Sequence, residues 1–171
     1  MRRYLTLAIV FQLIIFGSKA QLVNVDSEIT YIRTQYKAVN ELCKKITPIS
    51  LDADNESTEG GELLGYKGEE AIIKIQSTYY GETGKLVTEY YYNEASLFFV
   101  FSSSFDYNVP IYDTESFDLS KSVIIENRYY FKDAKLIKWL DREKKEVSSA
   151  LFKDKQADIN KESSLVLSRF N

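Results

Sequence analysis

Apolar side chains recur every three or four residues near the start of the chain, over residues 27–46. They form one stripe at helical spacing, made of Ile29, Ile32, Tyr36, Val39, Cys43 and Ile46. Asp26 or Ser27 is suited to cap the N-terminus of this segment. A thinner stripe over residues 149–168 predicts a second helix. The two patterns place one amphipathic helix near each end of the folded chain.

Between these helices the pattern changes to short runs rich in Ile, Val, Tyr and Phe, separated by turn residues. Five runs predict strands, at residues 71–80, 85–92, 96–105, 123–131 and 135–142. The polar, acidic segment 50–61 predicts a solvated loop, and residues 106–121 form an excursion between the third and fourth strands. We therefore expect an α+β fold, a five-stranded antiparallel meander with an N-terminal and a C-terminal helix packed on the sheet.

Three segments share one hairpin pattern. An aromatic residue is followed by two or three turn residues, a Gly or Ala, then a Lys or Ser and two apolar residues. The segments are YGETGKLV at 80–87, YNEASLF at 92–98 and FKDAKLI at 131–137. Such a pattern is typical of β-hairpins. Because alanine lacks the freedom of glycine at positive φ, Ala95 and Ala134 predict looser or longer turns.

The third predicted strand is apolar at every position from Leu97 to Phe101, so it has to be covered on both faces. We expect both helices on one face, and the 106–121 excursion, a curled sheet or a partner on the other. The first predicted strand alternates instead. Its polar residues Lys74, Gln76 and Thr78 predict a face open to water.

The first twenty residues predict a signal peptide, residues 1–20. Two arginines precede the apolar stretch Leu5–Phe16, and residues 18–20 place small side chains at the cleavage positions. We therefore expect an exported protein, in the periplasm or outside the cell, with no membrane anchor after cleavage. The mature chain is expected to form a single α+β domain over residues 21–171. The alternative is an uncleaved N-terminal anchor.

Charge and composition limit the classes of function that the protein can have. The chain of 171 residues is 44% hydrophobic and 27% charged, an ordinary globular composition. Removing the three basic residues of the signal peptide from the total leaves 19 basic and 25 acidic residues, a net charge of −6. Nucleic acid is therefore not expected as a partner. The absence of histidine removes the usual general base. The single cysteine, Cys43, excludes an intrachain disulfide and is expected to be a small buried side chain.

Two acidic clusters are the remaining candidates for chemistry. Asp52, Asp54 and Glu56 have the spacing that opens a calcium loop, but Ser57 and Leu63 replace its glycine and its bidentate glutamate. We therefore expect no metal site and no cofactor. The second cluster, in the 106–121 excursion, consists of Asp106, Asp113, Glu115 and Asp118. Two carboxyls at the right separation would suffice for a small hydrolase acting on envelope glycans.

The density of aromatic residues is more informative. Tyr90, Tyr92, Tyr130 and Trp139 are predicted to share one face of the sheet, with Arg128 at its border. They would either fill the core or form a surface that binds a protein or glycan partner. With no catalytic residue predicted, the leading hypothesis is a non-enzymatic exported binding protein that uses this aromatic face or the 106–121 loop. The alternatives are the carboxylate-dependent hydrolase and a homodimeric structural protein.

Three sequence motifs carry a resemblance to a known group of proteins. They are YGETGK at 80–85, EYYYNEASLFFVF at 89–101 and ENRYYFKDAKLIKWLD at 126–141. With them the chain resembles a family of small exported bacterial proteins of uncharacterised activity, whose hairpins carry three aromatic residues, Asp/Asn-Gly and Lys-Leu. The resemblance covers residues 59–142 and departs from the pattern where Ala95 and Ala134 replace glycine. It implies a periplasmic or secreted setting and assigns no activity, cofactor or catalytic residue.

Overall fold

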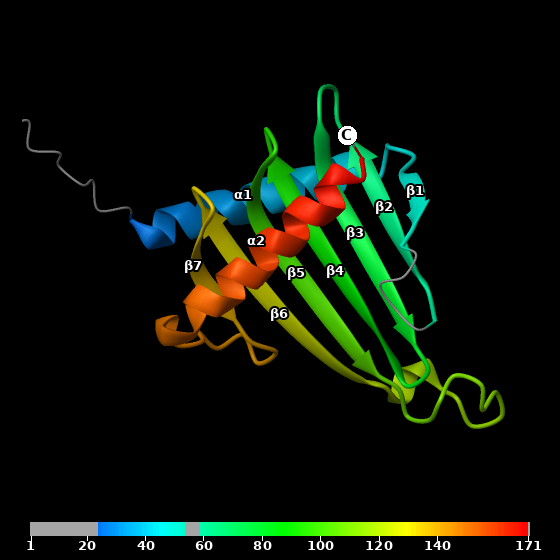
Figure 1. Ribbon diagram of the computed structural model, residues 1–171. Coiled ribbons are helices and arrows are strands. Elements are labelled where there is room, and N and C mark those ends of the chain that lie inside the picture. The colour runs from blue at the N-terminus through cyan, green and yellow to red at the C-terminus, as the bar shows by residue number, and fades with distance from the viewer. Residues whose placement is uncertain (1–23, 54–58, 171) are drawn as a thin grey trace, which may run out of the picture.

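The computed structural model describes residues 24–53 and 59–170 (Figure 1). The predicted signal peptide lies outside these residues, as do Asp54 and Glu56 of the calcium-like spacing. The described elements, in chain order, are α1 (Val25–Cys43), β1 (Ile49–Asp52), β2 (Gly61–Lys67), β3 (Ile72–Gly81), β4 (Gly84–Asn93), β5 (Ser96–Asp106), the 3₁₀ turn η1 (Leu119–Lys121), β6 (Val123–Lys132), β7 (Lys135–Leu140), the 3₁₀ turn η2 (Ser149–Leu151) and α2 (Phe152–Ser168).

The strands form one antiparallel sheet whose spatial order is the chain order, β1 to β7. The α+β class and the antiparallel meander are confirmed, but the expected number of five strands is wrong, because β1 and β2 add two. β1 has only four residues and is mostly exposed, so it shows little hydrophobic pattern. β2 contains two glycines, Gly61 and Gly65, which rank low in strand propensity. β2 becomes a strand by pairing with β3, and β1 becomes one by pairing with β2.

The two helices cover opposite faces of the sheet. In Figure 1, α2 crosses the near face diagonally and α1 runs behind the strands. On the α1 face, Ile29 and Ile32 pack with Tyr91, Phe99, Tyr130 and Leu140. On the α2 face, Ile159 and Val166 pack with a larger set that includes Ile75, Tyr90, Val100 and Phe131. The expectation of both helices on one face is therefore wrong, whereas the need for cover on both faces at Leu97–Phe101 is met.

Two β-bulges add apolar residues to the α1 face. The register shifts between Tyr91 and Tyr92 where β4 pairs with β5, and between Tyr130 and Phe131 where β6 pairs with β7. Each shift leaves one residue of the partner strand unpaired, and both extra residues, Phe98 and Ile137, pack into the α1 cluster. The bulge in β5 thus lets one strand place two consecutive apolar side chains, Phe98 and Phe99, in the α1 cluster.

The hairpin turns that contain alanine are tight. Asn93 pairs with Ser96, so only Glu94 and Ala95 form the turn, and both have positive φ, 47° and 64°. Asp133 and Ala134 form the matching turn between β6 and β7, at 49° and 59°. The expectation of looser turns is wrong, because the paired strands hold alanine in the left-handed conformation.

Ala95→Gly is expected to raise the free energy of unfolding by about 1 kcal/mol, because glycine adopts positive φ without the steric cost that alanine bears. Urea denaturation of the purified domain measures the change. Ala157→Gly, at an exposed position inside α2, is the control and is expected to lower the free energy by about 1 kcal/mol. A loss of stability in both variants would show that position 95 is not strained.

Candidate functional site

The four aromatic residues predicted to share a face are divided between the two sides of the sheet. Tyr90, Tyr92 and Trp139 lie on the α2 side, whereas Tyr130 lies on the α1 side. The three tyrosines are only 3%, 2% and 3% exposed. The single-face prediction is therefore wrong, and the physical reason is that a helix covers each face. A partner can reach Trp139 and Arg128, which are partly exposed, but not Tyr90 or Tyr92. Tyr130 can be reached only through a pocket beside α1.

Tyr92 and the partly buried Trp139 are packed and hydrogen-bonded as core residues. The Tyr92 hydroxyl donates to the backbone oxygen of Ser163 in α2 at 3.1 Å. Trp139 lies 5.3 Å from Tyr129, centroid to centroid, and its indole N–H donates to Asn127 Oδ1 at 2.9 Å. The core interpretation of the aromatic density thus describes these four residues better than an open recognition surface.

Arg128 and Tyr130 line a pocket between α1 and the sheet. The cavity has a volume of about 230 Å³. α1 provides four of its lining residues, and β5 and β6 provide two each; they are Ile32, Arg33, Tyr36, Lys37, Phe99, Phe101, Arg128 and Tyr130. Two of the five residues predicted to bind a partner therefore belong to one site, on the face opposite Tyr90 and Tyr92.

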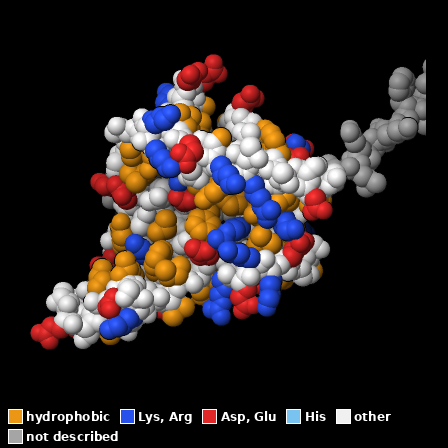
Figure 2. All heavy atoms as spheres, turned by 180° about the vertical axis from the view of Figure 1, so that it is seen from behind, with side chains coloured by type: hydrophobic (Ala, Val, Ile, Leu, Met, Phe, Trp, Pro, Cys, Tyr) orange, Lys and Arg blue, Asp and Glu red, His pale blue; other side chains and the backbone are white. Residues whose placement is uncertain are grey.

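Aromatic rings form the wall of this pocket. Phe99 lies between Tyr130 and Tyr36, with ring centroids 5.0 and 5.1 Å away. The guanidinium of Arg33 lies 5.9 Å from the Tyr130 centroid, and that of Arg128 lies 4.9 Å from the Phe101 centroid. In Figure 2, basic side chains gather beside hydrophobic ones on this side of the molecule. The arrangement joins a flat apolar wall to positive charge.

The charge of the pocket is one-sided. Three of its eight lining residues are cationic and none is acidic. Arg128 Nη2 donates to Glu126 Oε2 at 2.8 Å. The second amino group, Nη1, is buried and has no hydrogen-bond partner among the described residues. Glu126 and Arg128 are therefore paired two residues apart within β6, and the pair leaves one guanidinium donor unused.

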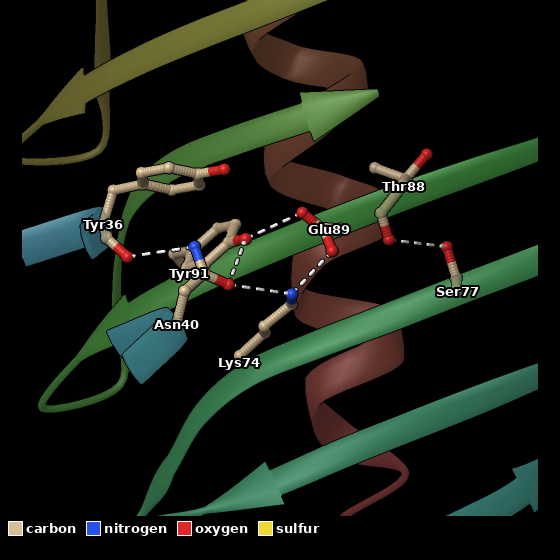
Figure 3. A network of polar contacts seen from close by, with 7 residues as sticks. All are labelled: Tyr36, Asn40, Lys74, Ser77, Thr88, Glu89 and Tyr91. Carbon is tan, nitrogen blue, oxygen red and sulfur yellow. Dashed lines mark hydrogen bonds and ion pairs between the residues drawn. The ribbon is translucent and has the colours of Figure 1, made fainter. Parts of the chain in front are cut away.

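A buried polar network next to the pocket joins α1 to β3 and β4 (Figure 3). Lys74 is 7% exposed, and its Nζ donates to Glu89 Oε1 at 2.6 Å and to Asn40 Oδ1 at 3.2 Å. The Tyr91 hydroxyl lies 2.7 Å from Glu89 Oε2 and 3.1 Å from Asn40 Oδ1. The network pairs the charges of Lys74 and Glu89 and bonds both strands to Asn40 of α1, so it fixes α1 on the sheet.

Burial, reinforced by the charge of Glu89, raises the pKa of Tyr91. The Tyr91 phenol therefore stays protonated and acts as a donor. Burial followed by the charge of Glu89 also raises the pKa of Tyr36, which lines the pocket, while Arg128 opposes that shift. Tyr36 thus lies within the electrostatic reach of both the network and the pocket.

Sequence reasoning missed this network because the alternation in β3 indicated that Lys74 and Thr78 face water. Both are buried, at 7% and 5% exposure. The strand register contains the missing information. Gln76 is the direct neighbour of Glu89, and Lys74 is the direct neighbour of Tyr91, so Lys74 and Glu89 form a diagonal cross-strand pair.

The acids of the 106–121 excursion shape the loop. Asp118 Oδ1 accepts from the backbone N–H and the hydroxyl of Ser120 at 2.9 and 2.6 Å, and these bonds lower the pKa of Asp118. Asp113 Oδ1 accepts from the N–H of Ser116 at 3.2 Å. A glycosidase acid needs a raised pKa, so Asp118 is not tuned for that role.

The same excursion exposes apolar side chains, and we call this region the apolar end. Its exposed residues come from the start of β4, the excursion, η1 and the start of β6, namely Leu86, Ile111, Tyr112, Leu119, Val123, Ile124 and Ile125. Gly84, Asp106 and Val123 are direct neighbours in three successive strands, so these segments meet at one end of the sheet. Figure 1 shows the excursion projecting from that end, beyond both helices.

Hydrogen bonds hold the excursion in place. The N–H groups of Tyr107 and Ile111 donate to the backbone oxygens of Thr83 and Glu82, at 2.8 and 2.9 Å. Asn108 joins the two sides of the loop, because its Nδ2 donates to the Ser116 oxygen at 2.9 Å. The loop is thus organised before any partner arrives.

Comparisons with protein-family models, curated proteins and solved structures returned no match. The resemblance to small exported bacterial proteins therefore stays a prediction. A function for this protein has to be argued from the geometry of the structure. Neither helix in the part of the chain that the structure describes is long and apolar enough to cross a membrane. Residues 24–53 and 59–170 contain no group of three or more acidic or cysteine side chains placed to hold a metal.

Cys43, the last residue of α1, is partly buried and makes no disulfide. Burial raises the pKa of its thiol. A raised thiol pKa lowers the thiolate fraction at neutral pH, which disfavours a nucleophilic role.

Proposed function

We propose that this protein is a non-enzymatic, exported binding protein that uses the apolar end to hold a protein partner. The observation that carries the proposal is the set of exposed apolar side chains at one end of the sheet, among which Tyr112 and Val123 are 68% and 53% exposed. Large apolar side chains that are exposed together at one end of a folded protein favour an interaction site there. The export part of the proposal rests on the predicted signal peptide, residues 1–20.

The chemistry of the apolar end favours a protein over a glycan as partner. Five of its seven exposed side chains are Ile or Leu, one is Val, and only Tyr112 carries a polar atom. Aliphatic side chains cannot hydrogen-bond to the hydroxyls of a sugar, whereas they suit the apolar core of a protein interface. The hydrogen-bonded excursion also reduces the entropy lost on binding.

A double variant, Tyr112→Ser with Val123→Ser, tests the proposal. We expect it to lower the affinity for the partner by at least about tenfold, because central aromatic and aliphatic contacts dominate interface energy. A photo-crosslinking residue at position 112 first captures the partner from an envelope extract, and the recombinant partner is then titrated against each variant. The control is Leu165→Ser, which changes a residue of α2 that is 52% exposed.

Equal affinity of the double variant and the Leu165→Ser control would refute this role of the apolar end. Sedimentation of the purified protein over a range of concentrations tests the homodimer alternative. A dimer that dissociates in the double variant would mean that the partner is a second copy of the chain. The hydrolase alternative has no comparable support, since Asp113 and Asp118 are engaged within the loop.

A further inference from the structure

The pocket between α1 and the sheet concentrates positive charge in a chain that is acidic as a whole. The full chain has a net charge of −3, yet Arg33, Lys37 and Arg128 converge on one cavity that has no acidic lining residue. Random placement of surface charge in an acidic protein does not favour such a cluster. An anion is the ligand that this field attracts.

Arg128 indicates where the anionic group would lie. Its Nη2 is occupied by Glu126 at 2.8 Å, while Nη1 is buried without a hydrogen-bond partner among the described residues. A buried N–H donor without an acceptor is unfavourable. Because Arg128 lines the cavity, an anionic oxygen bound there would lie beside its guanidinium, and guanidinium groups bind carboxylates through charge-assisted hydrogen bonds.

The wall of the pocket indicates the body of the ligand. Tyr36, Phe99 and Tyr130 form a continuous series of rings, each about 5 Å from the next, centroid to centroid. Such rings favour a flat apolar or aromatic group. The cavity has a volume of about 230 Å³, which is smaller than the roughly 300–1,000 Å³ of sites for drug-sized ligands. The largest ligand that it can hold therefore has one or two fused rings.

We propose that this pocket binds a small aromatic carboxylate. The carboxylate lies against Arg128, with Arg33 and Lys37 at the rim, and the ring system packs on Phe99 and Tyr130. The site is separate from the apolar end, which involves other residues. Failure of either proposal therefore leaves the other standing.

Isothermal titration of the mature protein with two isosteric probes, 2-naphthoate and 2-naphthamide, tests the proposal. The two share the ring system and differ in the polar group, which is an anionic, acceptor-only carboxylate in one and a neutral amide in the other. We expect 2-naphthoate to bind at least about tenfold more tightly, and the difference to shrink as salt is added, because salt screens the partly exposed cations. Amide chemical-shift changes caused by 2-naphthoate should map to α1, β5 and β6.

Two variants and a matched control locate the site. Arg128→Gln, and separately Arg33→Gln with Lys37→Gln, should each reduce the preference for 2-naphthoate by about fivefold or more. Positions 33 and 37 are exposed, so the second variant keeps the fold even if the first does not. Lys153→Gln with Lys161→Gln removes two exposed charges from α2 and should leave the preference unchanged.

Three results would overturn the proposal. One is equal affinity for 2-naphthoate and 2-naphthamide. Another is a preference that survives in both pocket variants or is lost equally in the α2 control. The third is an absence of 2-naphthoate binding at concentrations up to about 10 mM.

Discussion

Glu89→Leu is expected to lower the free energy of unfolding by about 3 kcal/mol, as found when one partner of a buried ion pair is removed. The side chains of Lys74 and Glu89 are 9% and 18% exposed and meet at 2.6 Å. Without Glu89, the Lys74 ammonium would stay buried with only the oxygen of Asn40 as a hydrogen-bonded partner. Urea denaturation at neutral pH measures the change.

Two further variants distinguish the loss of the Lys74–Glu89 ion pair from nonspecific destabilisation by the substitution. Lys74→Met combined with Glu89→Leu is expected to recover most of the loss, because no uncompensated charge is left. Glu41→Leu breaks the exposed pair with Lys44, whose side chains are 67% and 70% exposed, and should cost less than about 0.5 kcal/mol. If Glu89→Leu costs no more than Glu41→Leu, the buried pair does not stabilise the fold.

The protein is expected to lose stability steeply between about pH 10 and pH 12, because the unfolded chain releases tyrosine protons that the folded protein keeps. Burial raises the pKa of Tyr90, Tyr91 and Tyr92, and raises that of Tyr129 to about 12. The folded protein therefore holds these phenol protons more tightly than the unfolded chain, where tyrosine has a pKa of about 10. Stability is intact below pH 10 and falls as the pH rises through 10 toward the folded-state values.

Urea midpoints recorded from about pH 8 to pH 12, with tyrosinate absorbance followed in parallel, test this expectation. Tyr129→Phe keeps the ring and removes one ionising hydroxyl, so the alkaline loss should be smaller than in the wild type. A stability profile that is flat to pH 12, or identical in the Tyr129→Phe variant, would contradict the role of the buried phenols.

The polar network and the pocket depend on the same helix. Asn40, in the network, donates to the backbone oxygen of Tyr36 at 3.0 Å, and Tyr36 lines the pocket. Lys74 and Glu89 thereby hold one wall of the pocket in place from the sheet side. The Glu89→Leu variant therefore also tests whether loosening α1 weakens binding of 2-naphthoate.

Local patterns in the sequence predicted most of the elements. The stripe from Ile29 to Ile46 predicted a helix over residues 27–46, of which α1 ends three residues earlier, at Cys43. The hairpin pattern predicted the antiparallel meander, and both patterns arise from neighbouring residues. Prediction failed where local patterning is weak. β1 is four residues long and mostly exposed, so only pairing with β2 makes it a strand. The prediction of a looser turn at Ala95 was wrong for a related reason. Strand pairing outweighs the conformational preference of a single alanine.

The sequence by itself determined the α+β class, the up-and-down order of the central strands and the aromatic density of the sheet, since periodicity and turn chemistry act over a few residues. Only the tertiary structure decided that α1 and α2 cover opposite faces, that Tyr90 and Tyr130 face opposite ways, and that Arg128 meets Arg33 and Lys37 at one cavity. Those outcomes depend on where a helix docks on a sheet. Docking is set by the summed packing of side chains far apart in the chain, which no local pattern encodes.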